Sequence, residues 1–68
     1  MTGWKKVFES RIMHEAEIVK GVLIDNNINA VLINKKDSSY HFGNYEVMVE
    51  QENIIKAIKI IQDEIRFG

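Results

Sequence analysis

The spacing of apolar residues switches between the two-residue period of strands and the 3.6-residue period of helices, and this switching limits the possible folds most strongly. The clearest helical segment is residues 51–66. Its apolar residues recur at helical spacing: Ile54, Ala57, Ile58, Ile61 and Ile65. The polar residues lie mostly on the other side, so the sequence predicts a helix with one buried stripe.

An earlier segment, residues 12–27, has the same period. Its expected apolar stripe consists of Ile12, Ala16, Val19 and Leu23, widened by Ile18 and Val22. The pair Asn26–Asn27 predicts the end of this helix, because Asn tolerates the left-handed conformation that a C-terminal cap requires. Gly21 costs a helix about 1 kcal/mol relative to Ala. We expect close packing against a strand to explain it.

Three short segments are typical of strands: Trp4–Ser10, Asn29–Lys35 and Tyr45–Glu50. Simple alternation places Trp4 and Phe8 on the same face of the first. A right-handed crossover through the first helix leaves a gap between strands one and two, which strand three fills in antiparallel orientation. The sequence therefore predicts one α+β domain over residues 1–68. Its fold is a ferredoxin-like β-α-β-β-α sandwich, with a three-stranded antiparallel sheet in the order 1-3-2 and two helices on one face.

Composition excludes several classes of function. The chain has 68 residues and no cysteine, so neither a disulfide nor a thiolate metal site can stabilise its small core. Nine basic and ten acidic residues provide no basic face for nucleic acid. No segment approaches the roughly 20 apolar residues of a membrane span. We expect a cytoplasmic domain without nucleic-acid or membrane partners. We also expect that self-association can complete its small core.

Two surfaces are expected to stay open. The first strand has no neighbour where a fourth strand would pair, although Lys5 and Lys6 protect this edge in part. The sheet face away from the helices is expected to carry apolar side chains: Leu32, Met48 and either Trp4 or Phe8. Such a patch usually indicates a homodimer or a protein partner. The alternative is that the chain ends cover half of it.

Neither a catalytic nor a metal-binding constellation emerges. His14 and Glu17 form an i, i+3 pair, but His41 has no spacing that would supply a third zinc ligand. Residues 37–39, Asp-Ser-Ser, lie too close to His41 for a hydrolase triad, and turn chemistry explains them. Gly43 stands alone before a strand, which does not make a phosphate cradle. The sequence thus predicts a protein that is not an enzyme, with no cofactor and no metal.

The connection between the second and third strands, residues 36–44, exceeds the two to five residues common in hairpins. It contains three ring side chains: Tyr40, His41 and Phe42. One interpretation is that a base or ring stacks on Tyr40 and Phe42. The other is that one ring folds back over the sheet edge while Gly43 permits the turn. We expect residues 36–44 to serve primarily as a connection between the two strands, with a ligand site as the second interpretation.

The segments HEAEIVKGVLIDNNINAVLINK and YEVMVEQENIIKAIKII resemble a small bacterial family of putative signal-transducing proteins of unknown function. The positions that carry the resemblance are Glu15-Ala16, Leu23, Asn27-Ile28 and Val47-Met48-Val49. Asn27 stands where the family usually has Gly. The resemblance covers nearly the whole chain and implies a ferredoxin-like, PII-like plait. It implies no catalytic residues.

The leading hypothesis is a non-enzymatic regulatory binding module that acts through self-association, as a dimer, or through a protein partner. The alternative is a sensor of a small molecule, a metabolite or nucleotide, that uses residues 36–44. The candidate ligand or partner residues are Trp4, Phe8, Leu32, Tyr40, His41, Phe42 and Met48. An enzyme would need a pocket that gathers His14 or His41 with carboxylates, and the sequence gives no reason to expect one.

Overall fold

A computed structural model describes residues 3–35 and 44–65. Its elements are β1 (Trp4–Ser10), α1 (Met13–Asp25), β2 (Ala30–Asn34), β3 (Tyr45–Glu50), a 3₁₀ turn (Gln51–Asn53) and α2 (Ile54–Glu64). The order β-α-β-β-α confirms the order predicted from the sequence. Each helix is slightly shorter than its apolar pattern, because a cap or a turn occupies the flanking residues.

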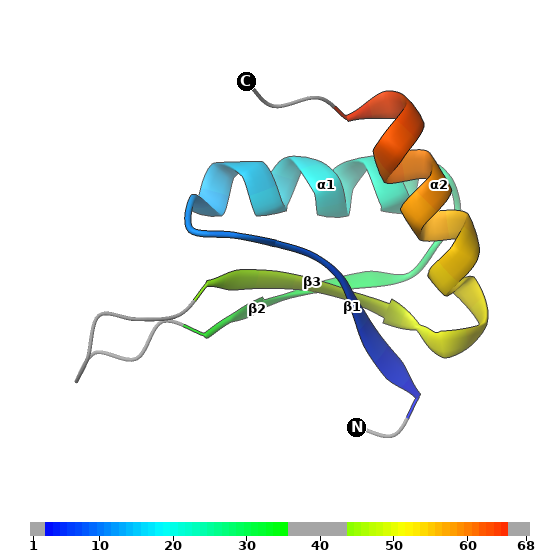
Figure 1. The fold of residues 1–68 in the computed structure, drawn as a ribbon, viewed down its shortest axis with the longest axis horizontal. Coiled ribbons are helices and arrows are strands. Elements are labelled where there is room, and N and C mark those ends of the chain that lie inside the picture. Colours follow the sequence, from blue (N-terminus) through cyan, green and yellow to red (C-terminus); the bar gives the residue numbers. More distant parts are fainter. Residues whose placement is uncertain (1–2, 36–43, 66–68) are drawn as a thin grey trace.

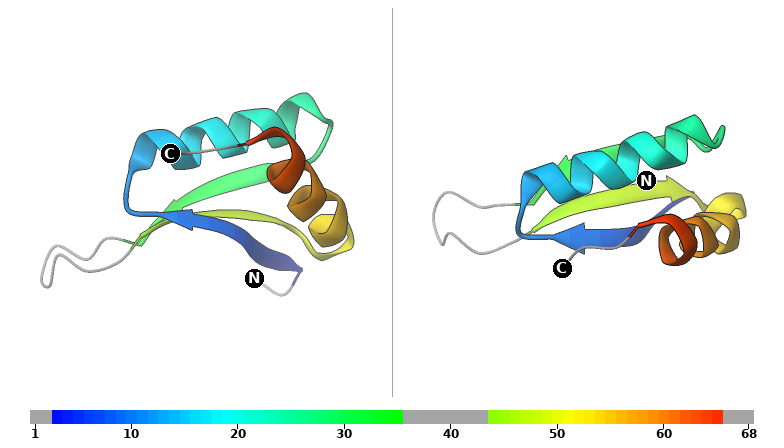
Figure 2. Two further views of the ribbon diagram at one scale, coloured as in Figure 1. Left: turned by 45° about the horizontal axis from the view of Figure 1, so that its top comes forward. Right: turned by 90° about the horizontal axis from the view of Figure 1, so that it is seen from above.

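The three strands form one antiparallel sheet in the order β1-β3-β2, as predicted. Both helices lie on the same side of this sheet (Figure 1). The view from above shows α1 running along the sheet while α2 crosses one end of it (Figure 2). The molecule is thin, 35 × 32 × 15 Å, as expected for a single sheet with a single layer of helices.

The core lies between the sheet and the helices. Its buried residues are small or β-branched in the main: Ala16, Val19, Leu23, Ile28, Ala30, Val47, Val49 and Ala57. No polar side chain is buried among the described residues. Half-buried side chains from β1, β2, β3 and α2 pack around this cluster. The burial of apolar side chains that stabilises the fold therefore occurs mainly on one face of the sheet.

The end of α1 confirms the cap predicted at the Asn pair. Asn27 has a left-handed backbone with φ of 65°. The N–H of Asn27 donates to the carbonyl of Ile24 at 2.9 Å, and the N–H of Ile28 donates to the carbonyl of Leu23 at 3.0 Å. These two bonds define a Schellman motif. Ile28 and Leu23 are both buried, so the cap also joins the core.

The helical stripes differ from the prediction at their margins. Ile12 is 56% exposed because it is the extended N-cap of α1, and Ile18 is 38% exposed. In α2, Ile58 is 39% exposed, whereas Ile60 packs against the core. The pattern identifies a helix, but the angle at which the helix crosses the sheet selects the flank that is buried. That angle is a property of the packed molecule.

Simple alternation in β1 was also a wrong prediction. Lys6 pairs with Met48 and Phe8 pairs with Val47, so one residue of β1, Val7, has no partner of its own in β3. This bulge turns both Val7 and Phe8 toward the core. Lys6 and Phe8 therefore lie on opposite faces of the sheet, contrary to the alternation.

Candidate functional site

The sheet face opposite the helices is not covered by any described element (Figure 1). The strand register assigns its side chains, because cross-strand partners share a face. Val31 pairs with Met48, and Trp4 pairs with the next residue of β3 on this face, Glu50. Val31, Ile33, Met48 and Trp4 are half-buried, and none belongs to the group that packs on the core. We call these four residues and the polar side chains around them the uncovered face.

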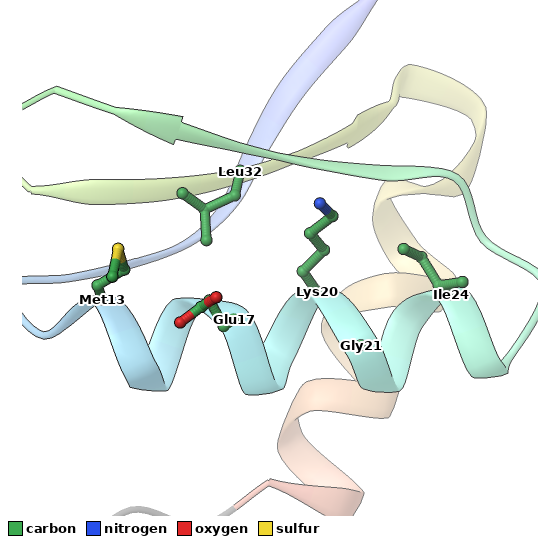
Figure 3. Close-up of a pocket in the computed structure, with 6 residues that line it drawn as sticks. All are labelled: Met13, Glu17, Lys20, Gly21, Ile24 and Leu32. Carbon is green, nitrogen blue, oxygen red and sulfur yellow. The ribbon is translucent and has the colours of Figure 1, made fainter.

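Two of the predicted face residues are elsewhere. Leu32 and Phe8 both pair with Val47, which is completely buried beneath the helices, and both pack against the core. Figure 3 shows Leu32 directed from β2 toward α1. For Phe8 the bulge is the reason. For Leu32 the reason is its packing against the core beneath α1, which leaves its neighbours Val31 and Ile33 on the uncovered face.

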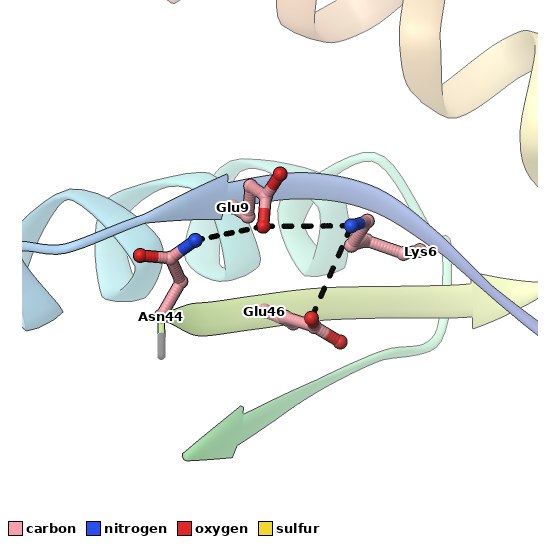
Figure 4. A network of polar contacts seen from close by, with 4 residues as sticks. All are labelled: Lys6, Glu9, Asn44 and Glu46. Carbon is pink, nitrogen blue, oxygen red and sulfur yellow. Dashed lines mark hydrogen bonds and ion pairs between the residues drawn. The ribbon is translucent and has the colours of Figure 1, made fainter. Parts of the chain in front are cut away.

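A polar network lies beside the apolar residues of the uncovered face (Figure 4). The Lys6 ammonium is 3.4 Å from a Glu9 carboxylate oxygen and 3.9 Å from one of Glu46. The Asn44 amide donates a hydrogen bond of 2.9 Å to Glu9. That hydrogen bond, and then the Lys6 charge, lower the pKa of the Glu9 carboxyl below its usual value. Glu9 is therefore an anion at neutral pH.

Acidic side chains border the apolar part of the uncovered face. Three carboxylates, those of Glu9, Glu46 and Glu50, project on it, and Lys6 is the cation among them. Glu50 accepts a hydrogen bond of 3.2 Å from the Asn29 amide. The four apolar side chains thus have a mainly acidic polar margin.

A second surface is a groove between α1 and the free side of β2. We call it the α1–β2 groove. It has a volume of about 470 Å³ and is lined by Met13, Glu17, Lys20, Gly21, Ile24 and Leu32. In Figure 3 the side chains of Met13, Lys20 and Ile24 project from α1 toward the strand. Met13 and Ile24 are 50% and 48% exposed, so the groove exposes large apolar side chains.

Gly21 contradicts the expectation drawn from the sequence. A Cβ built at this position would meet no atom within 4 Å. Gly21 is exposed in the α1–β2 groove and does not pack against a strand. No contact within the described residues explains the glycine.

Over residues 3–35 and 44–65 no three His, Cys, Asp or Glu side chains are grouped to hold a metal ion. His14 is exposed at the start of α1. In the same part of the chain, no helix is long and apolar enough to cross a membrane.

Three candidate ligand residues, Tyr40, His41 and Phe42, lie outside the described residues. The described residues that flank them are joined: the Lys35 N–H donates to the Asn44 carbonyl at 2.9 Å. The side-chain amide of Asn44 also donates a hydrogen bond to Glu9 on the uncovered face.

Sequence reasoning identified Trp4 and Met48 as surface residues but missed Val31, Ile33, Met13 and Ile24. The alternation in β2 separates Val31 and Ile33 from Leu32 without showing which set faces the helices. Met13 and Ile24 lie outside the apolar stripe predicted for residues 12–27, and that position was the available signal for their exposure.

The chain matches a known family over most of its length. A family model described as "Putative prokaryotic signal transducing protein" matches residues 4–65. This range includes every described strand and helix. No curated protein matches the chain significantly.

Proposed function

The chain belongs to the family of putative prokaryotic signal-transducing proteins, and we propose that it serves there as a non-enzymatic, cytoplasmic regulatory module. In this proposal the module acts by binding, through self-association or through a protein partner. The observation that carries the proposal is the uncovered face. Trp4, Val31, Ile33 and Met48 come from three strands and form an apolar surface that the core does not use.

The energetics of the fold support a binding role. Burial of apolar surface is worth about 25 cal/mol per Å², and side chains left on an open sheet face forgo part of it. Apolar patches on a small protein commonly mark an interaction site. Here the patch is bordered by the Glu9, Glu46 and Glu50 carboxylates, with Lys6 beside two of them. A protein partner suited to this face presents apolar side chains with a basic margin.

The test uses site-specific crosslinking in the producing cell. A photoreactive residue at Met48 should give a protein adduct, because this position lies at the centre of the uncovered face. The matched control is a photoreactive residue at Ile55, a large apolar residue on α2 that is 85% exposed. Met48→Glu should abolish an adduct captured from position 4, on β1 at the same face, since a carboxylate would be buried in the interface.

Two results would count against this proposal. Equal adducts from positions 48 and 55 would show that exposure alone accounts for crosslinking. Adducts from position 4 that survive Met48→Glu would show that the uncovered face does not bind. Circular dichroism of each variant, compared with Ile55→Glu, establishes that the fold is retained.

The small-molecule sensor is the second candidate. It depends on residues 36–44, with Tyr40 and His41 as its ring side chains. A thermal-shift screen with nucleotides and amino acids tests it. The expected result is a shift in the melting temperature that Tyr40→Ala or His41→Ala removes, and a screen without shifts contradicts it.

A further inference from the structure

The two edge strands of the described sheet differ in their protection. β1 carries Lys5, Lys6 and Glu9 and is interrupted by the bulge at Val7. Charges and bulges are the usual protection against edge-to-edge pairing. β2, Ala30–Asn34, has the sequence AVLIN, with neither a charge nor a proline, and its register with β3 is uninterrupted. β2 is therefore the edge suited to pairing with another strand.

The α1–β2 groove lies along this edge, and its charges are arranged as a complementary pair. Glu17 and Lys20 line the groove, and neither forms an ion pair with another described residue. Met13 and Ile24 lie outside them along α1, one toward each end. The order along the flank of the helix is thus apolar, negative, positive, apolar.

This order is self-complementary when two copies of α1 run antiparallel. The midpoint of Met13 and Ile24 falls between Ile18 and Val19, and so does the midpoint of Glu17 and Lys20. A two-fold axis there places Met13 against the partner's Ile24. It also places Glu17 against the partner's Lys20, twice by symmetry. Apolar groups meet apolar groups, and opposite charges meet.

We propose that two copies of the chain pair through β2, antiparallel about a two-fold axis near Leu32, to form a six-stranded sheet with the two α1 flanks in contact. Leu32 lines the same groove as Glu17 and Lys20, so one axis can serve both the strands and the helices. Gly21 gains a role in this arrangement. A residue without a side chain at the groove lets the partner's helix approach closely.

This pairing rests on the proposed function, in which the module acts through self-association. It specifies β2 and the flank of α1 as the surface through which two copies associate. It leaves the uncovered face free. Val31 and Ile33 of both copies become neighbours across the new strand pair, so two apolar patches join into one. A dimer would thus present a larger surface to a protein partner than one copy does.

A charge-exchange experiment tests the pairing by sedimentation velocity. Glu17→Lys leaves cation facing cation in both symmetric contacts, and Lys20→Glu leaves anion facing anion. Each single variant should raise the dimer dissociation constant by about tenfold or more at low salt, because like charges oppose each other. Lys59→Glu, an exposed charge reversal on α2, is the matched control and should leave the dissociation constant unchanged.

The decisive sample is an equimolar mixture of the two single variants. Every contact in the mixed dimer then joins opposite charges, so the mixture should dimerise about as tightly as the wild type. The double variant Glu17→Lys/Lys20→Glu should also recover dimerisation. Recovery shows that the single variants are folded, since an unfolded chain would not be rescued by mixing.

Amide hydrogen exchange gives a second measurement. The β2 amides that do not bond to β3 should gain protection as the protein concentration rises, whereas those of β1 should not. The pairing is overturned by a wild type that stays monomeric up to about 1 mM, by single variants that dimerise like the wild type, or by a mixture that fails to recover. The crosslinks from position 48 test the proposed function independently of the pairing, because Met48 lies on β3 and the charges exchanged here, Glu17 and Lys20, lie on α1.

Discussion

At the scale of the residue, Asn27 is the position with the clearest conformational demand. It has φ of 65° and joins α1 to the strand that follows. A residue with a Cβ generally pays about 1–2 kcal/mol in this region, which Asn reduces by local hydrogen bonding and Gly avoids. Asn27→Ala should therefore lower the free energy of unfolding by about 1 kcal/mol, whereas Asn27→Gly should preserve or raise it. Urea denaturation measures both, and equal stability of the two variants would contradict the role of φ.

At the scale of the element, α1 contains a helix-weakening residue that no described contact explains. Gly21→Ala should raise the free energy of unfolding of the monomer by about 1 kcal/mol, because Ala favours the helix and its Cβ would meet no atom within 4 Å. Denaturation at low protein concentration measures this. Lys59→Ala on α2 is the control for a general change in helix propensity. If Gly21→Ala instead lowers the free energy of unfolding of the monomer, the added Cβ meets another part of the protein, and this prediction is contradicted.

Gly21→Ala also distinguishes the effect of this position on the stability of the monomer from its effect on dimerisation. In the proposed pairing, the added methyl group lies between the two α1 flanks. Gly21→Ala should therefore weaken dimerisation while it strengthens the monomer. If Gly21→Ala is more stable and still dimerises like the wild type, Gly21 is not in the contact between the two copies, and that contact lies elsewhere along β2.

At the scale of the whole molecule, the limiting property is the small core. One layer of helices on one sheet face leaves half of the sheet without a covering layer, and a chain of this length is marginally stable. Self-association adds stability by mass action. The melting temperature of the wild type should rise by about 3–5 °C for each tenfold increase in concentration above the dissociation constant. That of Lys20→Glu should begin to rise only at concentrations about tenfold or more higher. Calorimetry at several concentrations tests this, and a constant wild-type melting temperature would argue against pairing.

Much of the fold was determined by local sequence. The order of elements follows from the apolar periods, and the sheet order 1-3-2 was predicted from a crossover through α1 that leaves a gap for β3. The end of α1 follows from the Asn pair. These features depend on neighbouring residues or on chirality, both of which a single sequence contains.

The surfaces were decided by tertiary structure. The alternation of β2 separates Val31 and Ile33 from Leu32, but only packing against α1 shows that Leu32 faces inward. The bulge at Val7 arises in the pairing of β1 with β3, and it reverses the face of Phe8. The groove exists because α1 leaves Met13 and Ile24 beyond the contact of helix and sheet. Periodicity reports which residues share a face, whereas the identity of that face depends on contacts between segments far apart in the chain.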